Sequence, residues 1–368
     1  MADAPLTLRD LNRATLARQM LLERAALPVP AAIERLVGLQ AQQAMPPFVG
    51  LWTRLEGFER DDLAGPITAR SVVKVTLMRA TLHLVTAEDY LALRGSIQPA
   101  LDKAFSSVKV VRDHSADIDF ERLIEAARAF IAEAPRTFAD ISAMLTELHP
   151  DAEIGPMRYA VRTTLPLVQV PVDKTWCYPG NPQWTLADDW LGQPVPKAID
   201  VPLLVRRYLA AFGPATVADF QTWSGLPGAK EAIDAMKPEL RMLRDERRRE
   251  LLDLPDQPLP GGDAPAPPRF LPEFDNLLLA HKDRTRVVAD EHRKRVYLPA
   301  LRVAATILVV GVVGGVWRVE KSKGAASLVI APFAPLNKAD RDALADEGER
   351  LVRFIDPGAK TYDVRFEA

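Results

Sequence analysis

Gln40 and Gln42 are the residues whose type and spacing most directly suggest chemistry. Two amides aimed at one point can orient a water molecule or recognise the edge of a base. They lie in the stretch 36–47 (LVGLQAQQAMPP), which has three glutamines and no charged residue and predicts a helix that stops at Pro46-Pro47. Residues two apart point about 200° apart on a helix, so the amides converge only if the helix unwinds before the prolines. The simpler interpretation is a polar helix end beside a loop.

Arg79 and His83 form a second polar group, in a predicted β-hairpin. The valine-rich and leucine-rich segments 72–79 and 81–85 predict two strands with a tight reversal or bulge near Arg79. Residues four apart share a face of a regular strand, so we expect Arg79 or His83 to line a site with the glutamines. The alternative is a hairpin with one exposed polar side.

Basic residues concentrate in two stretches. Residues 281–295 contain six lysines or arginines and three acids, and residues 241–250 contain five arginines and three acids. Arginine is the preferred partner of phosphate, which makes Lys282, Arg284 and Arg286 candidate phosphate contacts. An ordinary solvated surface is the other interpretation.

Several other chemistries find no support in the sequence. The single cysteine, Cys177, excludes an internal disulfide framework and a Cys-rich zinc site, and it favours a reducing compartment. No two histidines have i, i+4 spacing, and there is no Ser-His-Asp order and no glycine-rich phosphate loop. Paired carboxylates such as Asp61-Asp62 and Asp188-Asp189 are interpreted as helix caps. We therefore expect no metal and no cofactor.

Length and composition describe an ordinary soluble protein with more than one domain. The chain has 368 residues, of which 48% are hydrophobic and 26% charged, and this length predicts two to four domains. The formal net charge of −2 is low for a nucleic-acid binder, so a DNA-binding protein would have to gather its positive charge on one face. The first residues lack the charge and apolar run of a signal peptide, and we expect a cytoplasmic protein.

Residues 303–317 test the possibility of a membrane segment. They contain no charge, but they are too few to span a bilayer as a helix, and three glycines interrupt them. The valine content favours strands, with residues 312–317 as the turn between them. We interpret this segment as a buried β-hairpin and expect no membrane association.

A short motif occurs twice, 79 residues apart. Residues 135–141 (PRTFADI) and 214–220 (PATVADF) share proline, threonine, alanine and aspartate, and each follows an apolar predicted helix. In each, the threonine can cap a helix whose first turn holds the aspartate, as at the start of a helix-turn-helix pair. Two chance helix starts are the alternative. The continuation predicts second helices at 157–162 and 229–236, and wing strands at 167–170, at 176–178 and within 240–254.

These signals predict an α+β fold of tandem winged-helix modules with a C-terminal β-rich segment. Prolines crowd residues 255–272, which we interpret as a linker without helix or sheet. Beyond it we expect a strand at 327–331 and a last helix near 338–355. We divide the chain into a first winged-helix domain with the glutamines (1–115), a second (116–195), a third (196–258), and the linker with the C-terminal hairpin and helix (259–368).

Three blocks of residues together resemble a known family. They are Leu39-Gln40-Ala41-Gln42 after a helix pair, Met78–His83 on the hairpin, and Leu271–Asn276 after the linker. In this order, over nearly the whole chain, they resemble the bacterial winged-helix DNA glycosylases, the AlkZ and YcaQ relatives that unhook interstrand crosslinks. Glutamine–apolar–glutamine is similar to the AlkZ branch, whereas the YcaQ branch has aspartate in the second place.

The resemblance implies tandem winged helices around a concave DNA channel. It also implies a monofunctional DNA glycosylase that removes N7-alkylated purines, including those in interstrand crosslinks, without metal or cofactor. The catalytic residues it implies are Gln40 and Gln42; Arg79 and His83 are added on expected proximity alone. The partner would be double-stranded DNA carrying N7-alkylguanine adducts or crosslinks, and we expect a monomer. Self-resistance to a toxin and general alkylation repair both fit this motif.

An amide pair suits such a substrate. An N7-alkylated purine is already cationic and leaves as a neutral base without an acid, through a transition state that resembles an oxocarbenium ion. The site then needs only to place a water against the sugar carbon, and unmodified purines should be poor substrates. A crosslinked base cannot be flipped fully from the duplex, so an open channel is expected rather than a closed pocket.

Two other functions are compatible with these residues. Many winged helices belong to DNA-binding regulators without catalytic activity, although the net charge and the lack of a dimerisation heptad disfavour that function here. A protein that sequesters the alkylating compound itself is the third possibility.

Overall fold

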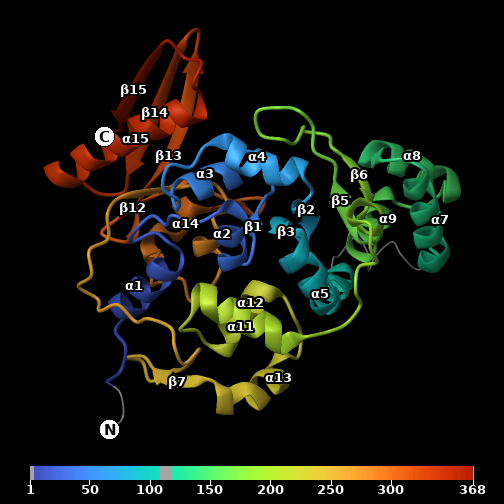
Figure 1. Ribbon diagram of the computed structural model, residues 1–368, viewed down its shortest axis with the longest axis horizontal. Coiled ribbons are helices and arrows are strands. Elements are labelled where there is room, and N and C mark those ends of the chain that lie inside the picture. Colours follow the sequence, from blue (N-terminus) through green and yellow to red (C-terminus); the bar gives the residue numbers. More distant parts are fainter. Residues whose placement is uncertain (1–3, 108–117, 368) are drawn as a thin grey trace.

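The computed structural model describes residues 4–107 and 118–367 and has the mixed α+β fold that the sequence predicts (Figure 1). The helices are α1 (Leu8–Arg18), α2 (Val29–Arg35), α3 (Pro46–Trp52), α4 (Arg60–Thr68), α5 (Ala87–Ser107), α7 (Phe120–Glu133), α8 (Phe138–Leu148), α9 (Ile154–Thr164), α10 (Ala187–Leu191), α11 (Val201–Phe212), α12 (Val217–Ser224), α13 (Ala229–Met236), α14 (Arg293–Val296) and α15 (Lys338–Ile355). The strands are β1 (Leu39–Gln40), β2 (Val72–Thr76), β3 (Leu82–Thr86), β4 (Arg136–Thr137), β5 (Leu167–Gln169), β6 (Gln183–Leu186), β7 (Arg241–Arg244), β8 (Glu250–Asp253), β9 (Arg269–Leu271), β10 (Tyr297–Leu298), β11 (Arg302–Val303), β12 (Thr306–Val309), β13 (Val312–Ser322), β14 (Ala325–Pro332) and β15 (Thr361–Phe366).

Pro46 and Pro47 begin a helix, which corrects the prediction that they stop one. Both lie in the first turn of α3, where a residue without a backbone N–H loses no helical hydrogen bond. The preceding helix, α2, ends earlier, at Arg35. The predicted hairpin is confirmed as β2 and β3, joined through the 3-10 turn η1 (Met78–Ala80).

The repeated motif starts two similar units, as predicted. Thr137 caps α8 in a reciprocal capping box with Asp140, and Thr216 caps α12 in the same way with Asp219. The first unit follows the order α7, β4, α8, α9, β5, β6, with β4 and β5 both paired to β6. The second follows the order α11, α12, α13, β7, β8, and a bridge between Ala215 and β8 takes the place of β4.

One predicted wing strand is wrong. Residues 176–178 form no strand, and the partner of β5 is β6 instead. Cys177 takes a positive φ of 62°, and both Cys177 and Tyr178 are buried in the core that α2, α3 and α4 share. Burial in a neighbouring core therefore holds this segment outside the sheet.

A six-stranded sheet in the order β1-β3-β2-β5-β6-β4 joins the first hairpin to the first unit. The connection is the antiparallel pair of Val75 on β2 and Val168 on β5. Figure 1 shows α7–α9 (green) at one end of the molecule and α11–α13 beside the N-terminal elements (blue). Residues of α5, α11, α12 and α13 share one core, whereas α7, α8 and α9 enclose another. The predicted boundary between residues 115 and 116 lies outside the described residues.

The C-terminal part is a five-stranded sheet, in the order β15-β14-β13-β12-β9, against which α15 packs. The stretch 255–272 contains no helix, as predicted, but it includes the buried strand β9, which corrects the expectation of no sheet there. The predicted hairpin is β12 and β13, and its turn is Val310-Gly311, with φ of 50° and 82°, rather than residues 312–317. No helix within residues 4–107 and 118–367 has the length and apolar character needed to cross a membrane.

Candidate functional site

Gln40 lies on a short strand, not at the end of a helix as predicted. After α2 the chain turns through Val37 and Gly38, whose φ values are 53° and 85°. A Cβ at position 38 would lie 2.6 Å from a methyl carbon of Val85 and 3.0 Å from the carbonyl oxygen of Leu84, so only glycine allows β1 to approach β3 this closely. Gln40 then pairs with His83 across the two strands.

Gln40 is the last residue of β1, and Gln42 follows two residues later in a bend beyond the strand. Gln40 Oε1 accepts a hydrogen bond from the Arg79 guanidinium (2.7 Å), and Gln42 Oε1 accepts one from the backbone N–H of Leu82 (3.0 Å). Gln40 is 7% exposed, whereas Gln42 lies on the surface. Both amide carbonyls are therefore directed at the same end of the β2–β3 hairpin.

Asn276 holds β1 on the side away from the hairpin. Its Oδ1 accepts the backbone N–H of Gln40 (3.1 Å), and its Nδ2 donates to the carbonyl oxygens of Gly38 and Leu36. Asn276 is buried and opens the turn η3 (Asn276–Leu278). One side chain thus satisfies the backbone on both sides of Leu39.

A buried ion pair positions Asn276. The neighbouring Asp275 accepts two hydrogen bonds from the Arg54 guanidinium, both 2.8 Å long, and both side chains are buried. Arg54 also donates to the backbone carbonyls of Gln19 and Gly50, at 3.1 and 2.9 Å. The block 271–276 therefore connects the C-terminal part to α1, α3 and β1.

Arg79 adopts a left-handed conformation at the tip of the hairpin, with φ of 56° and ψ of 23°. Its guanidinium bridges Gln40 Oε1 and the carbonyl oxygen of Trp223, at the end of α12 (2.5 Å). Burial, together with the nearby Arg284 guanidinium, lowers the pKa of Arg79 to about 10, so Arg79 is charged at neutral pH. This places a fixed positive charge beside Gln40.

His83 is 1% exposed, and its Nδ1 lies 3.1 Å from the carbonyl oxygen of Thr81. That carbonyl can only accept, which assigns the proton of the neutral ring to Nδ1. Burial, together with the charge of Arg79, lowers the pKa of His83 to about 3. The imidazole is therefore neutral at physiological pH and has no proton to give as an imidazolium.

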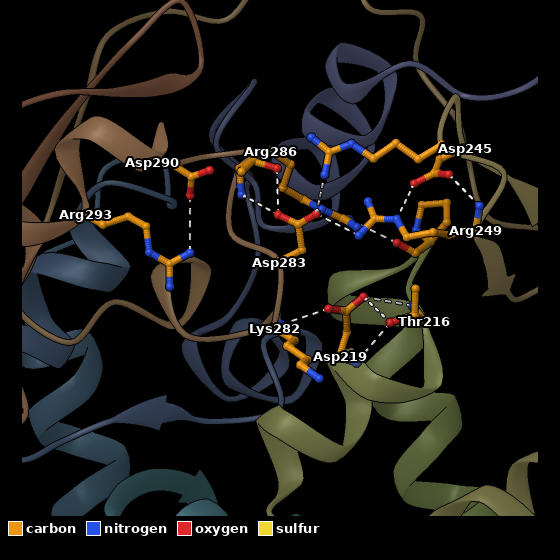
Figure 2. A network of polar contacts seen from close by, with 12 residues as sticks. Thr216, Asp219, Asp245, Arg249, Lys282, Asp283, Arg286, Asp290 and Arg293 are labelled. Carbon is orange, nitrogen blue, oxygen red and sulfur yellow. Dashed lines mark hydrogen bonds and ion pairs between the residues drawn. The ribbon is translucent and has the colours of Figure 1, made fainter.

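Arg79 contacts the Gln40 amide, and His83 pairs with Gln40 across β1 and β3, so both residues lie beside Gln40. The three candidate phosphate contacts, Lys282, Arg284 and Arg286, are more dispersed. Lys282 is exposed and lies beside the start of α12, where its backbone N–H donates to Asp219 (2.8 Å; Figure 2). Arg284 is half-buried and lies over the ring of Tyr297, with 4.2 Å between the guanidinium carbon and the ring centroid.

Arg286 lies in the interior. It is 4% exposed, and its guanidinium donates to the Thr15 hydroxyl (3.2 Å) and the carbonyl oxygen of Pro214 (3.0 Å). A guanidinium enclosed in this way is not placed to meet a phosphate. Arg286, which the basic composition of 281–295 marked as a phosphate contact, is therefore not proposed as one.

Sequence reasoning named the block 271–276 but gave Asn276 no role. The available signal was an asparagine beside an aspartate, immediately before an apolar run, which predicts a capped turn but not its partner. Within residues 4–107 and 118–367, no group of three or more His, Cys, Asp or Glu side chains has an arrangement that could hold a metal ion.

Comparisons with known proteins place the whole chain beside one group. The family model described as DNA glycosylase AlkZ-like matches residues 33–354. The interstrand DNA cross-link repair glycosylase of Streptomyces sahachiroi is 25% identical over 359 residues, which cover 91% of this chain and 93% of that protein. The solved structure of the DNA glycosylase AlkZ of Streptomyces sahachiroi has a TM-score of 0.76 at 21% identity and covers 99% of this chain and 100% of that one.

The contacts of Asn276 predict that Asn276→Ala weakens β1. The substitution leaves the N–H of Gln40 and the carbonyl of Gly38 without this partner, and a buried unpaired group costs about 1–3 kcal/mol. We expect urea denaturation to show a loss of that size and hydrogen exchange to show faster exchange of the Gln40 amide.

Asn337→Ala is the matched control, because Asn337 caps α15 and its removal costs about 1 kcal/mol without touching β1. It should lower stability and leave the exchange of the Gln40 amide unchanged. Equal exchange of that amide in Asn276→Ala and the wild type would show that Asn276 does not hold the strand.

Proposed function

This chain belongs to the AlkZ-like family of DNA glycosylases, and we propose that it hydrolyses the N-glycosidic bond of cationic N7-alkylated purines, with the attacking water held by Gln40 and Gln42. The substrates proposed include N7-alkylguanines in interstrand crosslinks, which is consistent with the name of the Streptomyces sahachiroi relative, an interstrand DNA cross-link repair glycosylase. Alkylation repair and self-resistance to an alkylating toxin would both use this reaction.

The observation that supports the catalytic proposal is the direction of the two amide carbonyls. Each accepts one hydrogen bond from the β2–β3 hairpin, and an amide oxygen has a second lone pair. A water at that end of the hairpin could donate one hydrogen bond to each. The two acceptors would then direct the water's own lone pair at the anomeric carbon.

The charges around the glutamines fit a substrate that is activated by its own positive charge. Amides are too weakly basic to take a full proton early in the reaction, and neutral His83 cannot protonate a leaving group at physiological pH. A purine alkylated at N7 leaves as a neutral base and needs no such acid. The hydrogen bond from Arg79 to Oε1 fixes the orientation of the Gln40 amide, and we therefore assign Arg79 a positioning role.

The order of the elements in the modules supports a proposal for how the protein binds DNA. We infer that the two repeated units, and the N-terminal helices with the β2–β3 hairpin, are three winged helices, divided at the residues predicted from the sequence. In such a module the helix after the turn enters a groove of the duplex, and α9 and α13 occupy that place here.

The glutamines would face double-stranded DNA in a concave channel between the three modules. Lys282 and Arg284 are the proposed phosphate contacts. We expect the enzyme to act as a monomer, in the cytoplasm, where bacterial DNA lies.

Substitution of both glutamines tests the catalytic proposal. We expect Gln40→Ala with Gln42→Ala to lower the single-turnover release of 7-methylguanine by about 100-fold or more, because a misplaced water can cost that much. Affinity for the damaged duplex, measured by fluorescence anisotropy, should change little. Gln43→Ala is the matched control, since Gln43 is exposed next to the pair and bonds Glu273 instead. Wild-type turnover by the double variant would refute the assignment.

The pH dependence of base release gives a second test. The amides do not titrate, the pKa of His83 is about 3, and the pKa of Arg79 is about 10. None of these groups changes charge between about pH 6 and pH 8, so the single-turnover rate on 7-methyladenine, a cationic purine without an N1–H to lose, should be flat over that range. A sigmoid or bell-shaped profile with a midpoint inside it would mean that a titrating acid or base carries the reaction.

A further inference from the structure

A cavity of about 380 Å³ lies on the first repeated unit and is not used by the proposed catalytic site. It is bounded by α9 on one side and by β5, β6 and the loop before β6 on the other. This volume falls in the range of small-molecule sites in proteins, about 300–1,000 Å³. The lining residues that matter here are Phe138, Arg158, Tyr159, Arg162, Gln169 and Trp184.

Aromatic rings form much of the wall. Trp184 is 4% exposed, and its ring meets Phe138 edge-on, with centroids 5.2 Å apart and an interplanar angle of 89°. Phe138 and Tyr159 are only half-buried, and the guanidinium carbon of Arg162 lies 5.3 Å from the centroid of the Tyr159 ring. Arg158 lies over Phe138 with its guanidinium carbon 5.6 Å from the ring centroid. A planar ligand can stack on such a surface, and a nearby cation suits one that carries phosphate.

Two buried polar atoms of this cavity's lining residues have no hydrogen-bond partner in the described part of the chain: Nε of Arg162 and Oε1 of Gln169. Gln169 itself is 4% exposed. A buried donor or acceptor without a partner costs about 1–3 kcal/mol, so native structures rarely retain one without a reason. Here one donor and one acceptor are both unmatched, and both belong to residues that line the same space.

The cavity lies next to the candidate active site. Arg162 donates from Nη2 to the carbonyl oxygen of Ala80 (3.2 Å), and Ala80 directly follows Arg79, which holds Gln40. Leu82, whose backbone N–H binds Gln42, packs against the core of the same unit as the cavity. Arg158, Tyr159 and Arg162 all come from α9, the helix proposed to meet DNA.

We propose that this cavity receives one unpaired nucleobase of the bound DNA, stacked on the aromatic wall and hydrogen-bonded by Arg162 and Gln169. The inference rests on the proposed function for its ligand, but the base it concerns is not the one that reacts. Each nucleobase presents a hydrogen-bond donor beside an acceptor on its pairing edge. These two groups complement the unpaired Nε of Arg162 and Oε1 of Gln169. A lesion that distorts the duplex would supply such a base, and its capture would bring Gln40 and Gln42 to the damaged site.

The test compares two DNA duplexes that differ by one unpaired guanosine in one strand. We expect the wild-type protein to bind the bulged duplex about tenfold more tightly than the paired one by fluorescence anisotropy, because stacking one base is worth about 1–3 kcal/mol. Gln169→Met keeps the volume, removes the acceptor and should lose most of this preference without weaker binding to the paired duplex. Gln183→Met is the matched control on β6, because Gln183 is exposed and does not line the cavity.

Phe138→Leu provides a second variant, which removes a stacking ring from a half-buried position and should also reduce the preference. Equal affinity of the wild type for both duplexes, or full preference in Gln169→Met and Phe138→Leu, would overturn the proposal. Release of 7-methylguanine, measured in parallel, separates the two proposals. One outcome would support the base-binding proposal and refute only the catalytic assignment. In it, the preference for the bulged duplex depends on Gln169, whereas turnover does not depend on Gln40 and Gln42.

Discussion

The backbone of Gln40 is held between β3 on one side and Asn276 on the other, and the direction of both amides depends on this arrangement. Pairing of Gln40 with His83, and the hydrogen bond from the Ala41 N–H to the carbonyl oxygen of Leu82, keep the chain beside β3, so that both amides reach the same end of the hairpin. Asn276 is fixed in turn by Asp275 and its buried pair with Arg54. Breaking such a pair by removing one partner typically costs about 3–5 kcal/mol. Two strands, a helix and a distant turn thus fix the position of one peptide.

The electrostatics of the site follow from the same packing. Because His83 is buried where the hairpin packs on its core, its imidazole stays neutral. The same packing places the charged Arg79 against Gln40 rather than in solvent. Around the pair the structure therefore offers acceptors for a water and a fixed cation, and the imidazole of His83 does not titrate near neutral pH. That arrangement suits a reaction in which the substrate already carries the charge that makes its base leave. The AlkZ-like family to which the chain belongs consists of DNA glycosylases, which break the bond between a base and its sugar.

Interactions local in sequence were predictable, and those that join distant segments were not. The capping boxes at Thr137 and Thr216 follow from residues three apart, so the two units could be recognised from the sequence alone. Strand β1 could not, because it is two residues long and its hydrogen bond to Asn276 spans 236 positions. From apolar periodicity alone, we predicted that the helix of α2 continues toward Gln40. Arg286 shows the same limit, since composition marks a basic stretch but only tertiary packing decides which arginine is buried.

The most direct test of the central claim is a crystal structure with DNA that carries a cationic pyrrolidine in place of the damaged nucleoside's sugar. This group mimics the oxocarbenium ion and cannot react. The account predicts the pyrrolidine beside β1, with one ordered water that donates hydrogen bonds to Oε1 of Gln40 and Oε1 of Gln42 and faces the ring atom that replaces C1′. A pyrrolidine bound away from β1, or a water held there by other groups while the Gln42 amide stays turned from it, would contradict the account.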